Sequence, residues 1–377
     1  MTTKLQKDSA VPDASPSLNG KTDQFPRSPS EINPAVMTDL VGQGRLGDNR
    51  IRDTKASLLA DGRGYLGQIA RIAVAYDGPT SLPPTYIAKF GSSGGQSRET
   101  AAQVGMYRRE IGFYQELAPK LEVSIPKLWA VRSDSSFLDH VILLEDVDTV
   151  DSDQIEGCSP EDAASVLKTI AHLHAQTWLD PWLRNCEWIP KLATPSRIDN
   201  LTRLARNGWA KVRSISGDLI GGREALLGAQ LSDLVPEALE RLDAMHWCLL
   251  HGDLRLDNIL FRPGGSEPVL IDWQGLSIGP AILDVGYFLI QSLATRDRQA
   301  HLRELLDLYL HHLGTFGVAA PASEELYVGL RSAAIFSLVV ACSVPVLDKA
   351  GDPRAMNLSR AMLERSLSAY FEFSSPN

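Results

Sequence analysis

The stretch His251-Gly252-Asp253-Leu254-Arg255-Leu256-Asp257-Asn258 decides the fold of this 377-residue chain. A β-like run, a Pro-Gly-Gly turn and a second apolar run follow it, and that second run ends in Asp272-Trp273-Gln274. The pattern is therefore HxDxxxxN, then a hairpin, then a strand that ends in an acid. Because apolar residues flank both polar segments, a polar surface loop of chance composition explains the pattern poorly.

Three polar side chains of this pattern fit three chemical roles. Asp253 can accept a proton from an attacking hydroxyl, whereas Asn258 and Asp272 can supply hard oxygens to Mg²⁺ on a triphosphate. We therefore predict Asp253 as the catalytic residue and Asn258 and Asp272 as metal ligands. Asp257 is also acidic, and it is the rival of Asp253.

A lysine on a predicted strand has a candidate partner on a predicted helix. Lys89 ends the apolar run Thr85–Phe90, and Glu110 lies 21 residues later within a helical pattern. Such a pair can hold an ammonium group against the α- and β-phosphates of a nucleotide. Each of the two can also be a solvated surface charge, and the neighbouring charges compete with Glu110 for the role: Glu99, Arg109 and Glu116.

The segment Gly62-Arg63-Gly64-Tyr65-Leu66-Gly67 spells GxGxxG, a pattern in which backbone amides can approach phosphate closely. In a dinucleotide-binding fold this motif opens a helix, whereas here it runs into the predicted strand 68–76. That context favours a glycine loop over ATP. A plain surface turn is the alternative.

The chain divides into a tail and two lobes. We expect residues 1–36 to be a disordered tail rich in Ser and Pro, residues 37–148 to form an ATP-binding N-lobe, and residues 149–377 to form a C-lobe. Within the N-lobe we expect a hairpin over 68–90, one helix over 98–117 and strands over 127–132 and 140–145. The C-lobe should open with a helix capped by Ser159, and it should contain a substrate insert (180–247), a catalytic loop (251–258) and a metal strand (269–274).

From about residue 40 to 372 the chain resembles the aminoglycoside phosphotransferase and choline kinase superfamily, and within it the ecdysteroid-kinase-like (CHK kinase-like) branch. The motifs that carry the resemblance are spread over both lobes. They are Lys89 in YIAKF, Leu143–Val147, Ile170–Ala175 with Trp178, His251–Phe261, Ile271–Gln274 and Asp284–Leu289.

The resemblance implies an α+β, bilobal protein-kinase-like fold with a small β-rich N-lobe and a larger, mainly helical C-lobe. It implies that the adenine of ATP meets the hinge at Glu145–Val147, that the γ-phosphoryl group moves from Mg-ATP to a hydroxyl of a small molecule, and that Asp284 steadies the catalytic loop. Two alternatives stay open: a catalytically silent kinase fold that binds a nucleotide or small molecule, and a kinase for amines of the fructosamine type.

Composition excludes several other classes. With 37 basic and 46 acidic residues the net charge is −9 and no basic run occurs, so nucleic acid is a poor partner. Four scattered cysteines form no metal spacing or disulfide framework, which indicates a reducing, cytoplasmic compartment. The apolar run Ala333–Leu347 is too short to span a bilayer and predicts a buried helix.

The spacing of two acids disfavours a protein substrate. Only eleven residues separate Asp272 from Asp284, which is too few for a loop that docks a peptide.

The sequence leaves the acceptor open. The insert between residues 180 and 243 holds nine basic and nine acidic residues. A binding site for a polycationic antibiotic is expected to have an excess of acidic residues. Five of the seven tryptophans lie between Trp178 and Trp247. They indicate either helix packing, an apolar acceptor, or an aromatic box for a quaternary amine. The sequence does not predict an oligomeric state.

Overall fold

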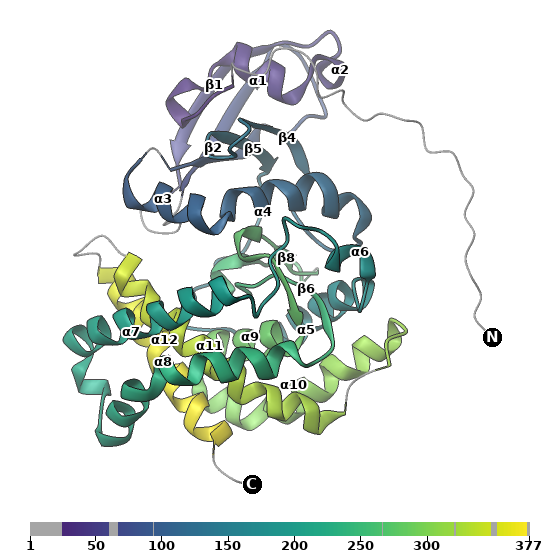
Figure 1. Cartoon of the computed structure of the whole chain (residues 1–377). Helices are drawn as coiled ribbons and strands as arrows, with labels where there is room; N and C mark the ends of the chain where they lie inside the picture. Colours follow the sequence, from purple (N-terminus) through teal and green to yellow (C-terminus); the bar gives the residue numbers. More distant parts are fainter. Residues whose placement is uncertain are drawn as a thin grey trace.

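The computed structural model describes residues 25–59, 67–92, 94–265, 267–319, 322–347 and 353–374. A five-stranded antiparallel sheet of order β1-β2-β3-β5-β4 forms the smaller lobe, and a larger, mainly helical lobe lies below it (Figure 1). This α+β architecture confirms the predicted fold class.

The sheet follows the expected alternation of apolar and polar residues. Its strands are β1 (Ile51–Leu58), β2 (Gly67–Tyr76), β3 (Thr85–Gly91), β4 (Leu128–Ser133) and β5 (His140–Glu145). In β2, Ala70, Ile72 and Val74 are buried while Arg71 and Ala73 face outward, because successive side chains point to opposite faces. β2 and β3 form the predicted hairpin, and β3 lies beside β5.

Ordered structure begins before residue 37. Phe25 packs against the core of the smaller lobe, and a short 3₁₀ turn covers Pro29–Glu31. Helix α1 (Pro34–Val41) starts at Asn33, whose side chain accepts hydrogen bonds from two backbone amides, and α2 (Gln43–Leu46) follows. The proposed tail therefore overlaps this structure in residues 25–36, whereas residues 1–24 lie outside the described residues.

The single helix expected over 98–117 is broken. α3 (Gly95–Val104) ends at Gly105, which has φ of 66°, and α4 (Met106–Gly112) continues into a π-helical turn (Phe113–Leu117) and a 3₁₀ turn (Ala118–Lys120). The apolar periodicity runs through the break, so it could not reveal a glycine in the left-handed conformation. Glu110 lies on α4, which crosses between the sheet and the helical lobe (Figure 1).

The larger lobe holds the remaining elements. It opens at α5, where Ser159 accepts from the amide of Asp162 and donates to its side chain, as the capping pattern predicts. Its helices are α5 (Pro160–Gln176), α6 (Pro181–Arg184), α7 (Pro195–Ile215), α8 (Gly222–Asp243), α9 (Ile282–Ser292), α10 (Thr295–Thr315), α11 (Ser323–Leu347) and α12 (Pro353–Ser374). Two small antiparallel pairs join β6 (Trp247–Leu250) to β9 (Ser277–Pro280) and β7 (Ile259–Leu260) to β8 (Val269–Leu270).

The main core lies in the helical lobe and reaches α4. Helix α11 packs against α7, α8, α9 and α12. Its segment Glu325–Val344 is, among the residues searched, the one stretch long and apolar enough to cross a membrane, but 67% of it is buried inside the structure. It is therefore the predicted buried helix. The ring of Phe113 stacks on Trp273 at 3.6 Å between ring centroids, which joins the Glu110-bearing segment to the region after β8.

Candidate active site

Lys89, Glu110 and Asp272 meet at the boundary of the two lobes. The Lys89 Nζ donates to Glu110 and, at 3.2 Å, to the Asp272 Oδ1. Glu110 is 1% exposed, and its second oxygen accepts from Gln274 at 3.1 Å. Of the competing carboxylates, Glu99 is exposed and Glu116 binds Arg108, so the structure pairs Lys89 with the glutamate that the sequence favoured.

The charges of Lys89 and Asp272 stabilise each other, whereas burial raises the pKa of Glu110 against the opposing charge of Lys89. Burial alone would lower the pKa of Lys89, but the carboxylates of Asp272 and Glu110 outweigh it and raise that pKa. Burial raises the pKa of Asp272, yet the Lys89 ammonium outweighs this and the pKa is lowered overall. Lys89 is thus a cation and Asp272 an anion at neutral pH.

Asp284 holds the catalytic loop in place. Its carboxylate accepts from the backbone amides of His251 at 2.6 Å and Gly252 at 2.9 Å, in agreement with the steadying role that the resemblance implies. Gly252 has φ of 79°, and a Cβ there would lie 2.1 Å from the carbonyl oxygen of Gly275. Glycine is therefore required where the loops after β6 and β8 touch through their backbones.

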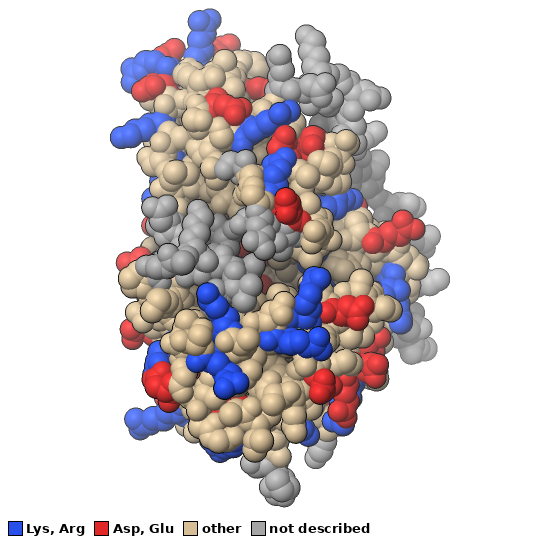
Figure 2. All heavy atoms as spheres, turned by 60° about the vertical axis from the view of Figure 1, so that its left-hand side comes forward, with Lys and Arg blue, Asp and Glu red and all other residues tan. Residues whose placement is uncertain are grey.

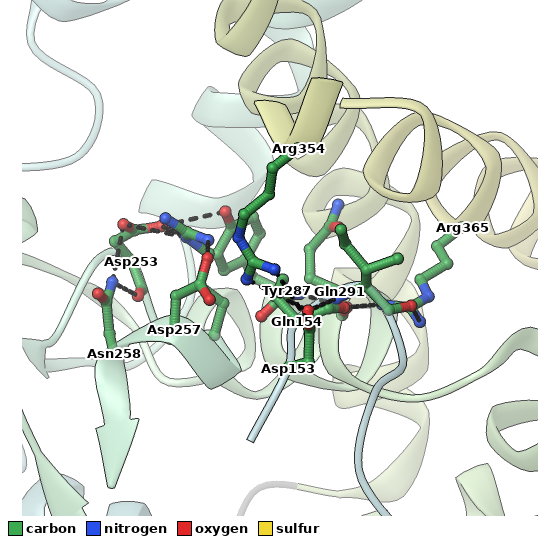
Figure 3. A network of polar contacts seen from close by, with 11 residues as sticks. Asp153, Gln154, Asp253, Asp257, Asn258, Tyr287, Gln291, Arg354 and Arg365 are labelled. Atoms are coloured by element: carbon green, nitrogen blue, oxygen red, sulfur yellow. Dashed lines mark hydrogen bonds and ion pairs between the residues drawn. The ribbon is translucent and has the colours of Figure 1, made fainter. Parts of the chain in front are cut away.

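The Asp253 carboxylate is held from several sides (Figure 3). The Tyr287 hydroxyl donates to one oxygen at 3.1 Å and the Asn258 amide to the other at 2.9 Å, while Arg255 approaches at 3.4 Å. Burial raises the pKa of Asp253. The charge of Arg255 lowers this pKa and the charge of Asp272 raises it, and the net shift is upward. Its rival Asp257 pairs with Arg255 instead, and Asp257 does not line the cavity described below.

Asn258 directly precedes strand β7 and Asp272 closely follows its partner β8, and the Ile271 amide donates to the Asn258 carbonyl at 3.0 Å. Within the described ranges, no hydrogen bond occupies the Asn258 Oδ1 or the Asp272 Oδ2, because the Asn258 amide nitrogen and the other Asp272 oxygen make the contacts. Among the same residues no group of three His, Cys, Asp or Glu side chains gathers. Two hard oxygens suit Mg²⁺, which takes most of its ligands from phosphate and water. The residues present therefore fit this ion.

A cavity of about 580 Å³ opens beside these groups. Lys89, Asp253 and Asp272 line it together with Gly67 and residues of α4, α7, α11 and α12. The insert predicted to hold substrate contributes α7 to this lining, whereas α8 contributes nothing to it. The cavity is thus the space in which a phosphate donor and an acceptor can meet.

The structure describes only some of the residues predicted to hold the nucleotide. Gly62 and Gly64 lie outside the described residues, and Gly67 is the first residue of β2, paired with Gly91. In the predicted hinge, the Glu145 side chain accepts from Arg262 at 3.0 Å and from the Lys127 amide at 3.1 Å. Val147 is buried, and neither of the two hinge residues lines the cavity.

Beside the catalytic loop, a second polar cluster ties the segment after the hinge to the last helices (Figure 3). Arg354 of α12 donates to Asp153 at 2.9 and 3.3 Å. Arg365, also of α12, donates to the carbonyls of Gln154 at 2.7 Å and Gln291 of α9 at 2.6 Å. These contacts hold the connection between the lobes against the helical lobe.

The sequence missed part of the site and left the role of the tryptophans open. Tyr287 lies within the quoted Asp284–Leu289 motif, but nothing in the sequence showed that its hydroxyl would reach Asp253. The tryptophans do not form an aromatic box, because none lines the cavity. Instead Trp182, Trp188 and Trp247 each stack with a surface cation, and Trp209 is buried.

Comparisons with known proteins show the family and the fold of this chain. The sequence model of the phosphotransferase enzyme family matches residues 73–323, more than half of the chain. A protein from Ralstonia eutropha JMP134 assigned as an aminoglycoside phosphotransferase is similar in structure, with a TM-score of 0.55, 17% identity, and coverage of 88% of this chain and 96% of that one. The microcompartment-associated aminopropanol kinase is also similar, with a TM-score of 0.50, 16% identity, and coverage of 83% and 90%. At these identities the likeness shows the fold alone, and no curated protein matched the chain.

Proposed function

Because the chain belongs to the phosphotransferase enzyme family, we propose that it moves the γ-phosphoryl group of Mg-ATP to a hydroxyl of a small molecule. The observation that carries this proposal is the opening of three groups into one cavity: the Asp253 carboxylate, the Lys89 ammonium and the Asp272 carboxylate. They correspond to the three tasks of such a transfer, namely alignment of the acceptor, orientation of the phosphates and binding of the metal.

Asp253 acts on the acceptor in this proposal. Tyr287 and Asn258 fix its carboxylate, so one oxygen can receive the hydrogen bond of an incoming hydroxyl and take its proton as the new O–P bond forms. The bond between the γ-phosphorus and the β,γ-bridging oxygen breaks, ADP leaves with that oxygen, and the proton stays on Asp253 until it passes to solvent. The raised pKa of this buried carboxyl favours proton acceptance.

The nucleotide is held from the other side. Lys89 is fixed by Glu110 and presents its ammonium to the α- and β-phosphates. Asn258 and Asp272 would hold Mg²⁺, which supplies positive charge to the phosphate oxygens when bound. Gly62, Gly64 and Gly67 are proposed to cover the phosphates, and the backbone of Glu145–Val147 to meet the adenine. The protein thus contributes position and charge, with little covalent chemistry of its own.

On the motifs quoted above, we also propose the ecdysteroid-kinase-like branch of the superfamily and a cytoplasmic location. The second point is supported by the four cysteines, all of which are free thiols. The domain limit at residue 149 is likewise a proposal, whereas a limit at residue 37 would cut helix α1, which contacts β1 and β4 as one element.

The test is a transfer assay with the purified full chain. We would incubate it with Mg-ATP and a pool of hydroxylated compounds (steroids and other terpenoids, choline, amino alcohols, macrolides, aminoglycosides and sugars) and search by mass spectrometry for a gain of one phosphoryl group. A product that disappears with Asp253→Asn supports the proposal. A product that is labile in acid would identify a phosphoramidate and hence an amine kinase. Absence of both product and Mg-ATP binding would indicate a catalytically silent fold.

A further inference from the structure

Arg109 is a buried cation without an acidic partner among the described residues. It precedes Glu110 on α4 and is 7% exposed. Its guanidinium donates only to backbone carbonyls, those of Val104 and, at 3.5 Å, Leu276. Burial of a charge costs free energy unless an opposite charge or full hydrogen bonding compensates it. Since Arg109 lines the cavity, a ligand there can provide that compensation.

A second arginine faces the same space. Arg197 of α7 lines the cavity, and within the described part of the chain its guanidinium makes no ion pair or hydrogen bond. Burial lowers the pKa of Arg109, and the charge of Arg197 lowers it further. Two like charges that share a cavity are stabilised by an anion that lies between them.

The cavity lining carries more basic than acidic side chains. Its two acids are Asp253 and Asp272, both assigned above to the hydroxyl and the metal, and its five bases are Lys89, Arg109, Arg197, Arg203 and Arg255. Within the described part of the chain, Lys89 and Arg255 pair with carboxylates, which leaves three arginines without an acidic partner. Helix α7 itself holds five basic residues and one acidic residue. Figure 2 shows blue side chains gathered on the helical lobe below the hollow between the lobes. The even charge balance of the insert in the sequence thus hides a basic face on the side of the cavity.

Part of the cavity wall is apolar. Phe336 and Val340 of α11 and Leu358 and Met362 of α12 line it. We propose that the acceptor is a hydroxy acid: an apolar body that packs on this wall, a hydroxyl at Asp253, and a carboxylate bound by Arg109 and Arg197. This inference rests on the proposed function and narrows its acceptor class. The two arginines would repel a polycationic acceptor.

The experiment compares matched acceptors. The full chain receives Mg-ATP with 12-hydroxydodecanoate or cholate, with the methyl ester of each, and with 12-amino-1-dodecanol, and the phosphorylated product is measured. We expect the free acids to be used with kcat/KM at least ~10-fold above the esters, because a charge-assisted hydrogen bond to carboxylate is lost in an ester. The amino alcohol should be the poorest acceptor.

Arg197→Gln tests the site directly, since Arg197 is only partly buried and its replacement leaves the core intact. We expect KM for the acids to rise ~10- to 100-fold, with KM for ATP and the rate with the esters within about twofold of wild type. Arg213→Gln is the matched control, because Arg213 lies on the same helix, is exposed and does not line the cavity. It should leave every parameter unchanged.

The outcomes separate this inference from the proposed function. Preference for the esters or the amino alcohol, or transfer to none of the acids while Mg-ATP still binds, would overturn the hydroxy acid and leave the kinase standing. An equal rise of KM for ATP in Arg197→Gln would assign the two arginines to the nucleotide phosphates instead. Failure to bind Mg-ATP at all would count against the kinase itself.

Discussion

The Nζ of Lys89 lies 3.2 Å from the Oδ1 of Asp272, although 183 positions separate the two residues in the chain. The same ammonium contacts Glu110, so one cation joins strand β3, helix α4 and the segment after β8. These three elements come from both lobes. The ion group therefore fixes the position of the proposed metal ligand relative to the proposed phosphate-binding lysine.

Lys89→Met should destabilise the protein as well as abolish activity. It leaves the buried Glu110 carboxylate without its cation, and breaking a buried pair by removing one partner costs about 3–5 kcal/mol. We expect urea unfolding to show a loss of this order. Lys89→Met/Glu110→Gln should recover part of the stability without recovering activity, because no unpaired Glu110 charge remains. A double variant no more stable than the single one would contradict this assignment.

Asp253→Asn should retain nucleotide binding and lose turnover. The amide cannot take the proton of the acceptor, and general base catalysis contributes about 10²- to 10⁴-fold. Steady-state kinetics and calorimetric titration with Mg-ATP measure the two effects separately. Asp257→Asn is the control, since Asp257 pairs with Arg255 and does not itself line the cavity. A larger loss in Asp257→Asn than in Asp253→Asn would reverse the two roles.

Asp272→Ala should remove the dependence of ATP affinity on Mg²⁺. The wild-type protein is expected to bind ATP more tightly with Mg²⁺ than with EDTA, because Asp272 and Asn258 would hold the ion between protein and phosphate. In the variant, calorimetry should give the same affinity with and without the metal. Unchanged Mg²⁺-dependent affinity would exclude Asp272 as a ligand.

Gly252→Ala should disrupt the catalytic loop, and Gly264→Ala supplies its matched control. Both glycines have positive φ, 79° and 87°, so alanine is strained at each by about 1 kcal/mol. Only at Gly252 would the new Cβ also meet the Gly275 carbonyl, at 2.1 Å, whereas the space around Gly264 is open. We expect a stability loss of about 3 kcal/mol or more with loss of activity at Gly252. Equal effects at the two positions would contradict the close contact.

Stability should fall below neutral pH through His140. Burial lowers the pKa of this 2% exposed side chain from 6.5 to about 4. In the unfolded chain His140 takes a proton near its ordinary pKa while the folded protein does not, so the free energy of unfolding decreases as the pH falls from 6.5 to 4, by about 3 kcal/mol in total. His140→Gln should flatten this part of the pH profile, whereas His311→Gln, at an exposed histidine, should leave it unchanged. An identical profile in His140→Gln would show that other groups cause the acid sensitivity.

Much of the fold could be predicted from local patterns. The alternation in β2, the capping box at Ser159 and the apolar run of α11 each depend on neighbours in sequence, and each is present in the structure. The break at Gly105 was missed because the apolar spacing is the same on both sides of it. The start of ordered structure before residue 37 was missed because Ser and Pro there suggested only a tail.

In the candidate site, too, local patterns predicted some contacts and could not predict others. Spacing in one segment predicted that Asp253 and Asn258 would lie together, and a strand-helix pattern predicted that Lys89 would meet Glu110. The contact of Tyr287 with Asp253 and the shared cavity of Arg109 and Arg197 depend on how α9, α4 and α7 pack, which no short-range pattern contains. The charge totals of the insert did not predict the basic side chains of the cavity lining, because totals do not say which face of a helix carries the charge.

Helix α12 supplies part of the apolar cavity wall and both arginines that hold the segment after the hinge. During synthesis this helix leaves the ribosome after every residue proposed to perform the chemistry. A nascent chain that has already released Asp253 and Asp272 therefore still lacks one wall of its acceptor cavity. We therefore expect phosphoryl transfer to an acceptor to begin only after α12 has docked.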